Sequence, residues 1–227
     1  MFCPYKYKLI YIDGAETPVT GDISFGHSLH GALEKYHRQE NGSFDFLMEC
    51  YNDAWKSGGF ESPLKLFEYY LRGKSMLENY YNSLKQNAGG GKPVYIEEKF
   101  EANIGKYRFI GIIDRIDKMS DGSFEIIDYK THSQIWTQER ADRDLQMSFY
   151  IHACRTILGI NPKTASFYFL SQNKKIQTKR TSADIETAIE TALDCAQKIN
   201  SEDFSPNISN CFRCELKQKC KIRKQDF

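Results

Sequence analysis

The sequence predicts an α/β domain in which a mixed central sheet, built around an antiparallel meander, is flanked by helices. Residues 20–90 carry apolar and aromatic side chains at helical spacing. From residue 92 the pattern changes to runs of β-branched and aromatic residues separated by turn signals. Helix and strand signals then alternate to residue 200. A meander set between helical segments is typical of a mixed α/β architecture.

The helical first part divides into two stretches. Residues 24–55 have apolar and aromatic residues at helical spacing, and "NGS" interrupts this helical stretch. The next stretch begins with Ser62 as a helix cap and Pro63 in the first turn. The glycine run 89–91 closes this stretch as a flexible connection. It is not a phosphate-binding loop, because its spacing to Lys92 is wrong and no Ser or Thr follows.

The meander is expected as three strands at about 94–101, 106–118 and 123–130, with turns at "ANIG" and "SDGS". After it, the sequence predicts a helix at about 142–158, strands in "TASFYFL" and "KKIQTKR", and a helix from near Ser182.

Composition excludes several classes of protein. Hydrophobic residues make up 41% of the chain and charged residues 27%, as in ordinary soluble globular proteins. The formal charge of +1 gives no sign of nucleic-acid binding. No apolar run approaches a membrane span and no signal peptide opens the chain, so we expect a cytoplasmic protein without membrane association.

The stretch "FEIIDYKTHSQ" places a carboxylate and an ammonium on one strand face. Asp128 and Lys130 are two positions apart, and strand side chains alternate faces. "GIIDRID" on the preceding strand carries Asp114, which hairpin pairing can bring near Asp128. Two close carboxylates repel unless a proton or a cation lies between them, and oxygen ligands suit Mg²⁺ or Mn²⁺. The motif "DYK" by itself is more often part of a solvated strand face. The combination of Asp114 with Asp128 and Lys130 on the adjacent strand favours a metal site instead. Arg115 and Asp117 lie on the opposite face of their strand from Asp114 and are expected to be structural.

The seven cysteines fall into two groups. Three stand singly in predicted helices and are expected to be buried free thiols: Cys50, Cys154 and Cys195. Four lie near the two ends of the chain, where they could bind one metal group: Cys3, Cys211, Cys214 and Cys220. Sulfur ligands in this number suit a tetrahedral zinc or a 4Fe–4S cluster, and the spacing does not choose between them.

"GIIDRID" followed by "EIIDYKT" closely resembles the core of the PD-(D/E)XK nuclease superfamily. The RecB-type exonuclease branch, with the CRISPR-adaptation nucleases and the AddB nuclease domain, is the most similar. "GHSLHGALEKY" resembles its helical motif through Gly26, His30, Leu33 and Tyr36. "QMSFY" supplies the Gln and Tyr of its Q-x-x-x-Y motif, and "CPYKYKL" with "CFRCELKQKC" resembles the cysteine framework of its iron–sulfur members.

This resemblance implies a restriction-endonuclease-like core and a role for each matching residue. The metal would be held by His30, Asp114, Asp128 and the backbone carbonyl of Tyr129. Lys130 would be the catalytic lysine beside the two aspartates, and Glu98 an acid that supports the metal ligands indirectly. Gln146 and Tyr150, one helical turn apart, would position the DNA strand. For the four terminal cysteines, the resemblance favours a structural 4Fe–4S cluster over zinc.

The expected organisation is a single nuclease domain over residues 1–227. It would comprise a helical region at 20–90, a catalytic sheet core at 92–180 and a cluster region at 205–224 with Cys3. Members of this branch have a helix before the first cysteine, whereas Met1 lies two residues before Cys3. This indicates either a short start or a truncated chain.

The expected activity is metal-dependent hydrolysis of DNA, as an exonuclease on single strands or processed ends, with a helicase, recombination or CRISPR-adaptation partner. Two alternatives stay open. One is a catalytically inactive DNA-binding adaptor protein, which would bind without metal and cleave nothing. The other is a zinc-stapled enzyme that acts on RNA, which assays on matched substrates would distinguish.

Overall fold

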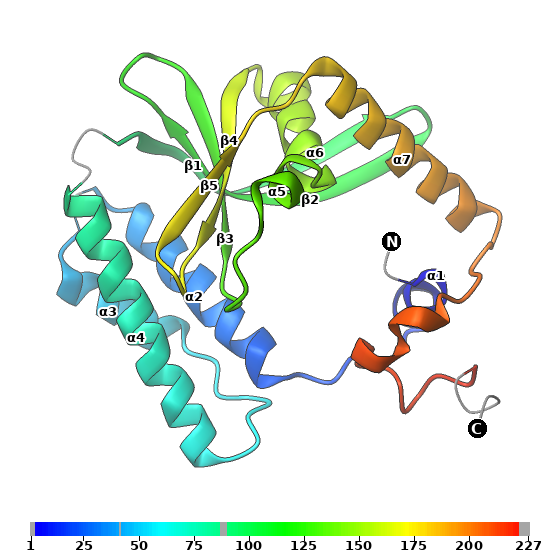
Figure 1. Cartoon of the computed structure of the whole chain (residues 1–227), viewed down its shortest axis with the longest axis horizontal. Helices are drawn as coiled ribbons and strands as arrows, with labels where there is room; N and C mark the ends of the chain where they lie inside the picture. The colour runs from blue at the N-terminus through cyan, green and yellow to red at the C-terminus, as the bar shows by residue number, and fades with distance from the viewer. Residues whose placement is uncertain (1–2, 41, 87–89, 223–227) are drawn as a thin grey trace. The chain divides into compact units, whose positions relative to one another are not determined.

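The computed structural model describes residues 3–40, 42–86 and 90–222, and the chain divides into two compact units. Thr20–Ile189 form the larger unit, which contains the sheet and most helices (Figure 1). Met1–Val19 and Glu190–Phe227 form the smaller one. The predicted "NGS" interruption and glycine connection lie partly outside the described residues, at Asn41 and Gly89.

The larger unit contains a mixed five-stranded sheet in the order β1-β2-β3-β4-β5. Three strands form the predicted antiparallel meander: β1 (Lys92–Ile104), β2 (Tyr107–Lys118) and β3 (Phe124–Lys130). Two more complete the sheet: β4 (Pro162–Phe169), parallel to β3, and β5 (Lys174–Thr178), antiparallel to β4. The predicted meander, mixed sheet and flanking helices are therefore confirmed.

Three helices precede the sheet in this unit: α2 (Gly21–His37), α3 (Phe44–Ala54) and α4 (Pro63–Gln86). A hydroxyl side chain caps the first turn of each. Thr20 accepts a hydrogen bond from the backbone N–H of Ile23, Ser43 from that of Phe46, and Ser62 from that of Lys65. The predicted cap at Ser62 is confirmed, and the predicted interruption of the first helical stretch separates α2 from α3.

The three helices pack on one face of the sheet (Figure 1). Their buried residues, including Leu29, Leu33 and Leu77, share one hydrophobic cluster with Ile127 and Tyr129 of β3. Because side chains alternate along a strand, the neighbours at positions 128 and 130 project from the other face. This alternation separates the hydrophobic core from the polar site described below.

The parallel pairing of β3 with β4 requires a crossover between them, which three helical pieces supply. They are α5 (Gln138–Asp142), α6 (Leu145–Ala153) and the π-helical turn η2 (Cys154–Leu158). One helix over 142–158 was predicted, and this was wrong at its N-terminal end. There Asp144 interrupts the helical path and caps α6 by accepting a hydrogen bond from the backbone N–H of Gln146, at 2.9 Å.

The smaller unit joins the two ends of the chain. Its N-terminal part folds as α1 (Pro4–Tyr7) and the π-helical η1 (Lys8–Ile12). Its C-terminal part includes the end of α7 (Ser182–Asn200) and the 3-10 helix η3 (Ile208–Arg213). The Lys6–Glu215 ion pair, at 2.6 Å, connects the two parts. In the described part of the chain, no helix has the combination of length and apolar character needed to cross a membrane.

Candidate active site

The site forms where β2 and β3 separate. Their pairing runs from Lys118 with Phe124 to Arg115 with Ile127. One residue further along, the Asp114 carboxylate accepts a hydrogen bond from the backbone N–H of Tyr129, at 2.7 Å. A side chain thus satisfies a backbone donor that the strand ladder no longer pairs. This bond ties the position of Asp114 to β3.

Three candidate metal ligands from three elements meet at Asp114. His30 of α2, Glu97 of β1 and Asp114 of β2 place ligand atoms within 4.8 Å of one another. The Nδ1 atom of His30 lies 3.4 Å from Asp114 Oδ2 and 4.0 Å from Glu97 Oε1. Among the described residues, no other group of three or more His, Cys, Asp or Glu side chains meets the same condition.

Protonation in this group is shifted by burial and by charge. Burial raises the pKa of Glu97 to about 7, and the negative charge of Asp114 adds to the increase. Burial by itself lowers the pKa of His30, but the hydrogen bond and charge of Asp114 outweigh it, so that this pKa is raised. Both shifts favour a bound proton, which indicates a concentration of negative charge that a cation would neutralise.

Asp128 and Lys130 lie side by side on the polar face of β3. Lys130 Nζ is 2.6 Å from Asp128 Oδ2, and Asp128 is 3% exposed. Apart from this ion pair, Asp128 Oδ2 has no polar partner among the described residues. Burial raises the pKa of Asp128 to about 6; the charge of Lys130 opposes the shift and that of Asp114 adds to it. A buried carboxylate that contacts one ammonium still has lone pairs with which to bind a metal cation.

Lys130 also reaches the predicted DNA-binding residues of α6. Its ammonium donates a hydrogen bond to Gln146 Oε1 at 3.2 Å, and Gln146 Nε2 donates to the Tyr150 hydroxyl at 2.7 Å. Burial raises the pKa of Tyr150, so the phenol stays protonated. The cap at Asp144 sets this geometry, because it places Gln146 in the first turn of α6.

The structure therefore brings together most of the predicted site. His30 contacts Asp114, and Asp128 contacts Lys130, which in turn contacts Gln146. The group of three candidate ligands does not include the predicted Asp128 or the predicted supporting acid Glu98; it includes Glu97, the neighbour of Glu98. Glu97 has a φ of 48°, a left-handed conformation that breaks the normal alternation of β1. The adjacent glutamates of "EEK" gave no signal to distinguish them, because the choice depends on this backbone irregularity.

The family model for the PD-(D/E)XK nuclease superfamily matches residues 1–221. The chain belongs to the PD-(D/E)XK nuclease superfamily.

Two known proteins are similar to this member of the superfamily. One component of the ATP-dependent helicase/deoxyribonuclease of Streptococcus mutans serotype c (strain ATCC 700610 / UA159) is 34% identical over 92 residues. That match covers 38% of this chain and only 8% of the relative's own length. A crystal structure from Eubacterium rectale, provisionally described as an exonuclease, has a TM-score of 0.53 at 11% identity. It covers 99% of this chain and 81% of the other, and it shows the shared fold.

The opposite face of the nuclease hairpin carries a buried polar network. Arg115 is 6% exposed and donates hydrogen bonds to the hydroxyls of Tyr80 and Tyr129 at 2.5 and 2.7 Å. Its other terminal nitrogen donates to Asp117 at 2.8 Å. Burial, with the charge of Arg115, lowers the pKa of His37 well below its usual value. The predicted structural face of Arg115 and Asp117 is confirmed, and His37 belongs to it.

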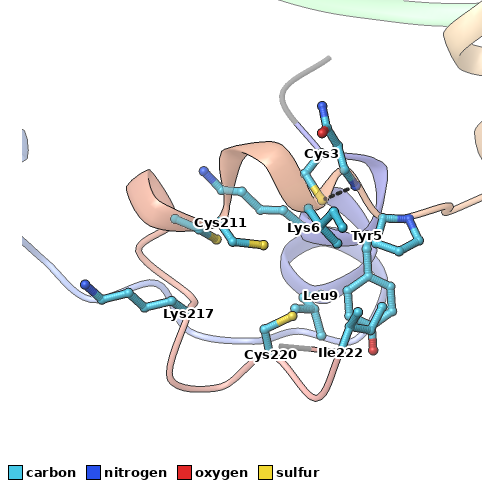
Figure 2. Close-up of a pocket in the computed structure, with 12 residues that line it drawn as sticks. Cys3, Tyr5, Lys6, Leu9, Cys211, Lys217, Cys220 and Ile222 are labelled. Carbon is cyan, nitrogen blue, oxygen red and sulfur yellow. Dashed lines mark hydrogen bonds between the residues drawn. The ribbon is translucent and has the colours of Figure 1, made fainter. Parts of the chain in front are cut away.

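Four cysteines from the two ends of the chain line one pocket of the smaller unit: Cys3, Cys211, Cys214 and Cys220. Figure 2 shows Cys3, Cys211 and Cys220 around this pocket, with Lys6 and Lys217 beside them. The backbone N–H of Asn207 donates a hydrogen bond to Cys3 Sγ, at 3.4 Å. Of the single cysteines, Cys50 and Cys154 are buried as predicted. Cys195, in α7, is only partly buried, so the prediction for it was wrong.

Proposed function

We propose that this chain is a divalent-metal-dependent deoxyribonuclease. The observation that supports this most directly is the convergence of His30, Asp114 and Asp128 beside Lys130. The donor set of one imidazole and carboxylates, including the buried Asp128 whose Oδ2 contacts Lys130, fits Mg²⁺ or Mn²⁺. Glu97 adds a further carboxylate to this set, and the carbonyl of Tyr129 remains a predicted ligand.

Each residue has a distinct task in this proposal. A divalent cation held at the site would polarise the scissile phosphate and activate a water. Lys130 presents its ammonium to the charge that develops on the phosphate. Gln146 holds Lys130 by accepting its hydrogen bond, and Tyr150 in turn fixes Gln146. Asp114 positions the site because its carboxylate is bonded to the β3 backbone.

The test is cleavage of end-labelled DNA with Mg²⁺ or Mn²⁺. We expect Asp114→Ala and Lys130→Ala to abolish cleavage, and chelation with EDTA to stop the wild-type reaction. Asp53→Ala and Lys163→Ala are matched controls, because each changes the same residue type in an exposed surface ion pair. Full cleavage by either site variant would reject the assignment. RNA of the same sequence tests the alternative substrate.

Substrate form and partners belong to the same proposal. We infer action on single-stranded or processed ends as an exonuclease, and association with a helicase, recombination or CRISPR-adaptation partner. The S. mutans relative, named as part of a helicase/deoxyribonuclease, supports a helicase partner most directly. Linear and circular single strands of equal length test the need for an end. Cleavage of both at the same rate would reject exonuclease action.

The four terminal cysteines are proposed to hold a structural 4Fe–4S cluster, with zinc as the alternative. Their lining of one pocket and the N–H···S bond to Cys3 support a shared metal group. The cationic Lys6 and Lys217 beside them suit a group with net negative charge. Absorption spectroscopy after anaerobic purification, with iron, sulfide and zinc counted on one sample, tests the choice. Zinc without iron would reject the cluster.

A further inference from the structure

The chain that follows β3 carries a cation stacked on an aromatic ring next to the catalytic lysine. The guanidinium carbon of Arg140 lies 4.2 Å from the centroid of the Trp136 ring. Lys130 Nζ lies 5.5 Å from the same centroid. Trp136 itself packs on the fully buried rings of Phe167 and Phe169 in β4, at 4.7 and 5.8 Å. Arg140 is thus held on a rigid support beside the active site.

The guanidinium of Arg140 has no polar partner among the described residues, although its side chain is in a defined position. Every other arginine whose side chain is described makes a hydrogen bond or an ion pair. Arg143, one turn further along, pairs with Glu139 at 3.1 Å. Stacking uses the flat face of a guanidinium and leaves its N–H groups directed outward in the plane. The donors of Arg140 are therefore free to bind a ligand.

Charge near the site indicates the kind of ligand. The ammonium of Lys130 is already neutralised by Asp128, at 2.6 Å. Arg140 has no such partner, so its positive charge is not compensated locally. The ring of the exposed His132 stacks on that of Trp136, with 6.1 Å between the ring centroids, and it lies near the positive charges of Lys130 and Arg140. Burial lowers its pKa, and the charges of Lys130 and Arg140 lower it further. An anion with two acceptor oxygens suits bidentate binding by the guanidinium, and the two non-bridging oxygens of a phosphodiester are such acceptors.

We propose that Arg140, held in place by Trp136, binds a backbone phosphate of the DNA strand that flanks the phosphate cleaved beside Lys130. This inference rests on the proposed nuclease function and adds a substrate contact to it. Arg140 is a binding residue and Trp136 a positioning residue. Because the contact is to the backbone, it acts equally on every base sequence.

The test is binding of a fluorescein-labelled single-stranded oligonucleotide of mixed sequence, with Ca²⁺ in place of Mg²⁺, at several salt concentrations. Loss of one phosphate contact should reduce the slope of log affinity against log salt by about 0.7 for a single strand. We expect Arg140→Ala to weaken binding about tenfold, as for the loss of one charged hydrogen-bonding group. Arg140→Lys should restore part of the affinity, since it keeps the charge and loses the planar fork.

Arg143→Ala is the matched control, because it removes an arginine of the same crossover that is already ion-paired. Trp136→Phe should weaken binding less than Arg140→Ala, because a smaller ring still supports the guanidinium. In cleavage assays Arg140→Ala should raise KM and leave kcat nearly unchanged.

Equal losses in Arg140→Ala and Arg143→Ala would overturn the inference, since they would show a general charge effect. The inference would also be overturned if Arg140→Ala had a lower melting temperature and an unchanged slope of log affinity against log salt. Arg140 would then only stabilise the fold by packing on Trp136. If wild type cleaves DNA and Arg140→Ala binds normally, the inference fails and the nuclease proposal stands. If wild type neither binds nor cleaves, the nuclease proposal itself fails.

Discussion

The carboxylate of Asp114 accepts a hydrogen bond from the backbone N–H of Tyr129, at 2.7 Å, at the point where β2 and β3 part. The same carboxylate lies 3.4 Å from His30. One side chain therefore has two tasks, since it completes the backbone hydrogen bonding of β3 and supplies charge to the proposed metal site. The two tasks can be separated by substitution.

Asp114→Asn keeps an oxygen that can accept the Tyr129 bond but removes the charge. We expect it to fold with wild-type stability and to lose about 100-fold or more in cleavage. Asp114→Ala removes the acceptor as well, and an unsatisfied backbone donor should lower the free energy of unfolding by about 1–3 kcal/mol. Urea unfolding and cleavage assays on both variants check this. Equal stability of the two variants would contradict the structural task of Asp114.

Tyr150→Phe tests the link from α6 to Lys130. The substitution removes the hydroxyl that accepts the hydrogen bond from Gln146 and keeps the buried ring, which packs edge-on against Phe100. Stability should change little, whereas kcat/KM should fall about tenfold because Gln146 holds Lys130 less firmly. Tyr107→Phe, outside this link, is the control. Unchanged kinetics in Tyr150→Phe would indicate that the tyrosine serves only as part of the core.

Metal-free protein should become more stable as the pH falls from about 8 to 5. The pKa of Asp128 is raised to about 6 and that of Glu97 to about 7, so the native state binds more protons than the unfolded state in this window. The raised pKa of His30 acts in the same direction: its contribution is complete below the unfolded pKa and is lost as the pH rises through the folded one. The lowered pKa values of His37, His132 and His152 oppose these groups below about pH 6.5.

The measurement is the difference in unfolding free energy between wild type and Asp128→Asn at each pH. Asparagine cannot ionise, so this difference isolates the contribution of Asp128. The variant should gain stability relative to wild type above about pH 6, where the charged aspartate is costly. A difference that does not vary with pH would mean that Asp128 titrates normally. Added Mg²⁺ or Mn²⁺ should stabilise wild type more than the variant at neutral pH.

Cys3→Ser should lower the iron content from the expected value of about four per chain and destabilise the smaller unit. Cys3 accepts a hydrogen bond from Asn207 and lines the cysteine pocket, so its loss removes a link between the two ends of the chain. Cys195→Ser is the matched control, since this thiol is partly buried and does not line that pocket. Iron analysis and thermal melting are the measurements. Unchanged values in Cys3→Ser would reject its role as a ligand.

Local patterns in the sequence were enough to predict the meander and the residues on its polar face. Alternation along a strand has a period of two, so Asp128 and Lys130 share a face in any sheet that β3 joins. Helical spacing likewise sets which side of α2 carries the buried Leu29 and Leu33. The cap at Ser62 was predictable because it depends on residues three positions apart.

Other features depend on contacts between distant segments. The choice of Glu97 over Glu98 follows from a backbone φ of 48° in β1, which no local pattern indicates. Asp144 could have continued a helix, but its side chain caps α6 and places Gln146 at Lys130. The stacking of Arg140 on Trp136 requires the buried rings of β4 beneath it.

By itself, the sequence determined the order of the elements, the faces of the strands and the residue types available for metal binding, because these depend on short-range periodicity. Only the tertiary structure decided which acid joins His30 and Asp114, and which of the described arginines is left without a polar partner. The first choice depends on the backbone of β1 at Glu97, and the second on how the segment after β3 packs on β4. Both bring together residues that are far apart in the sequence, so no short-range pattern indicates them.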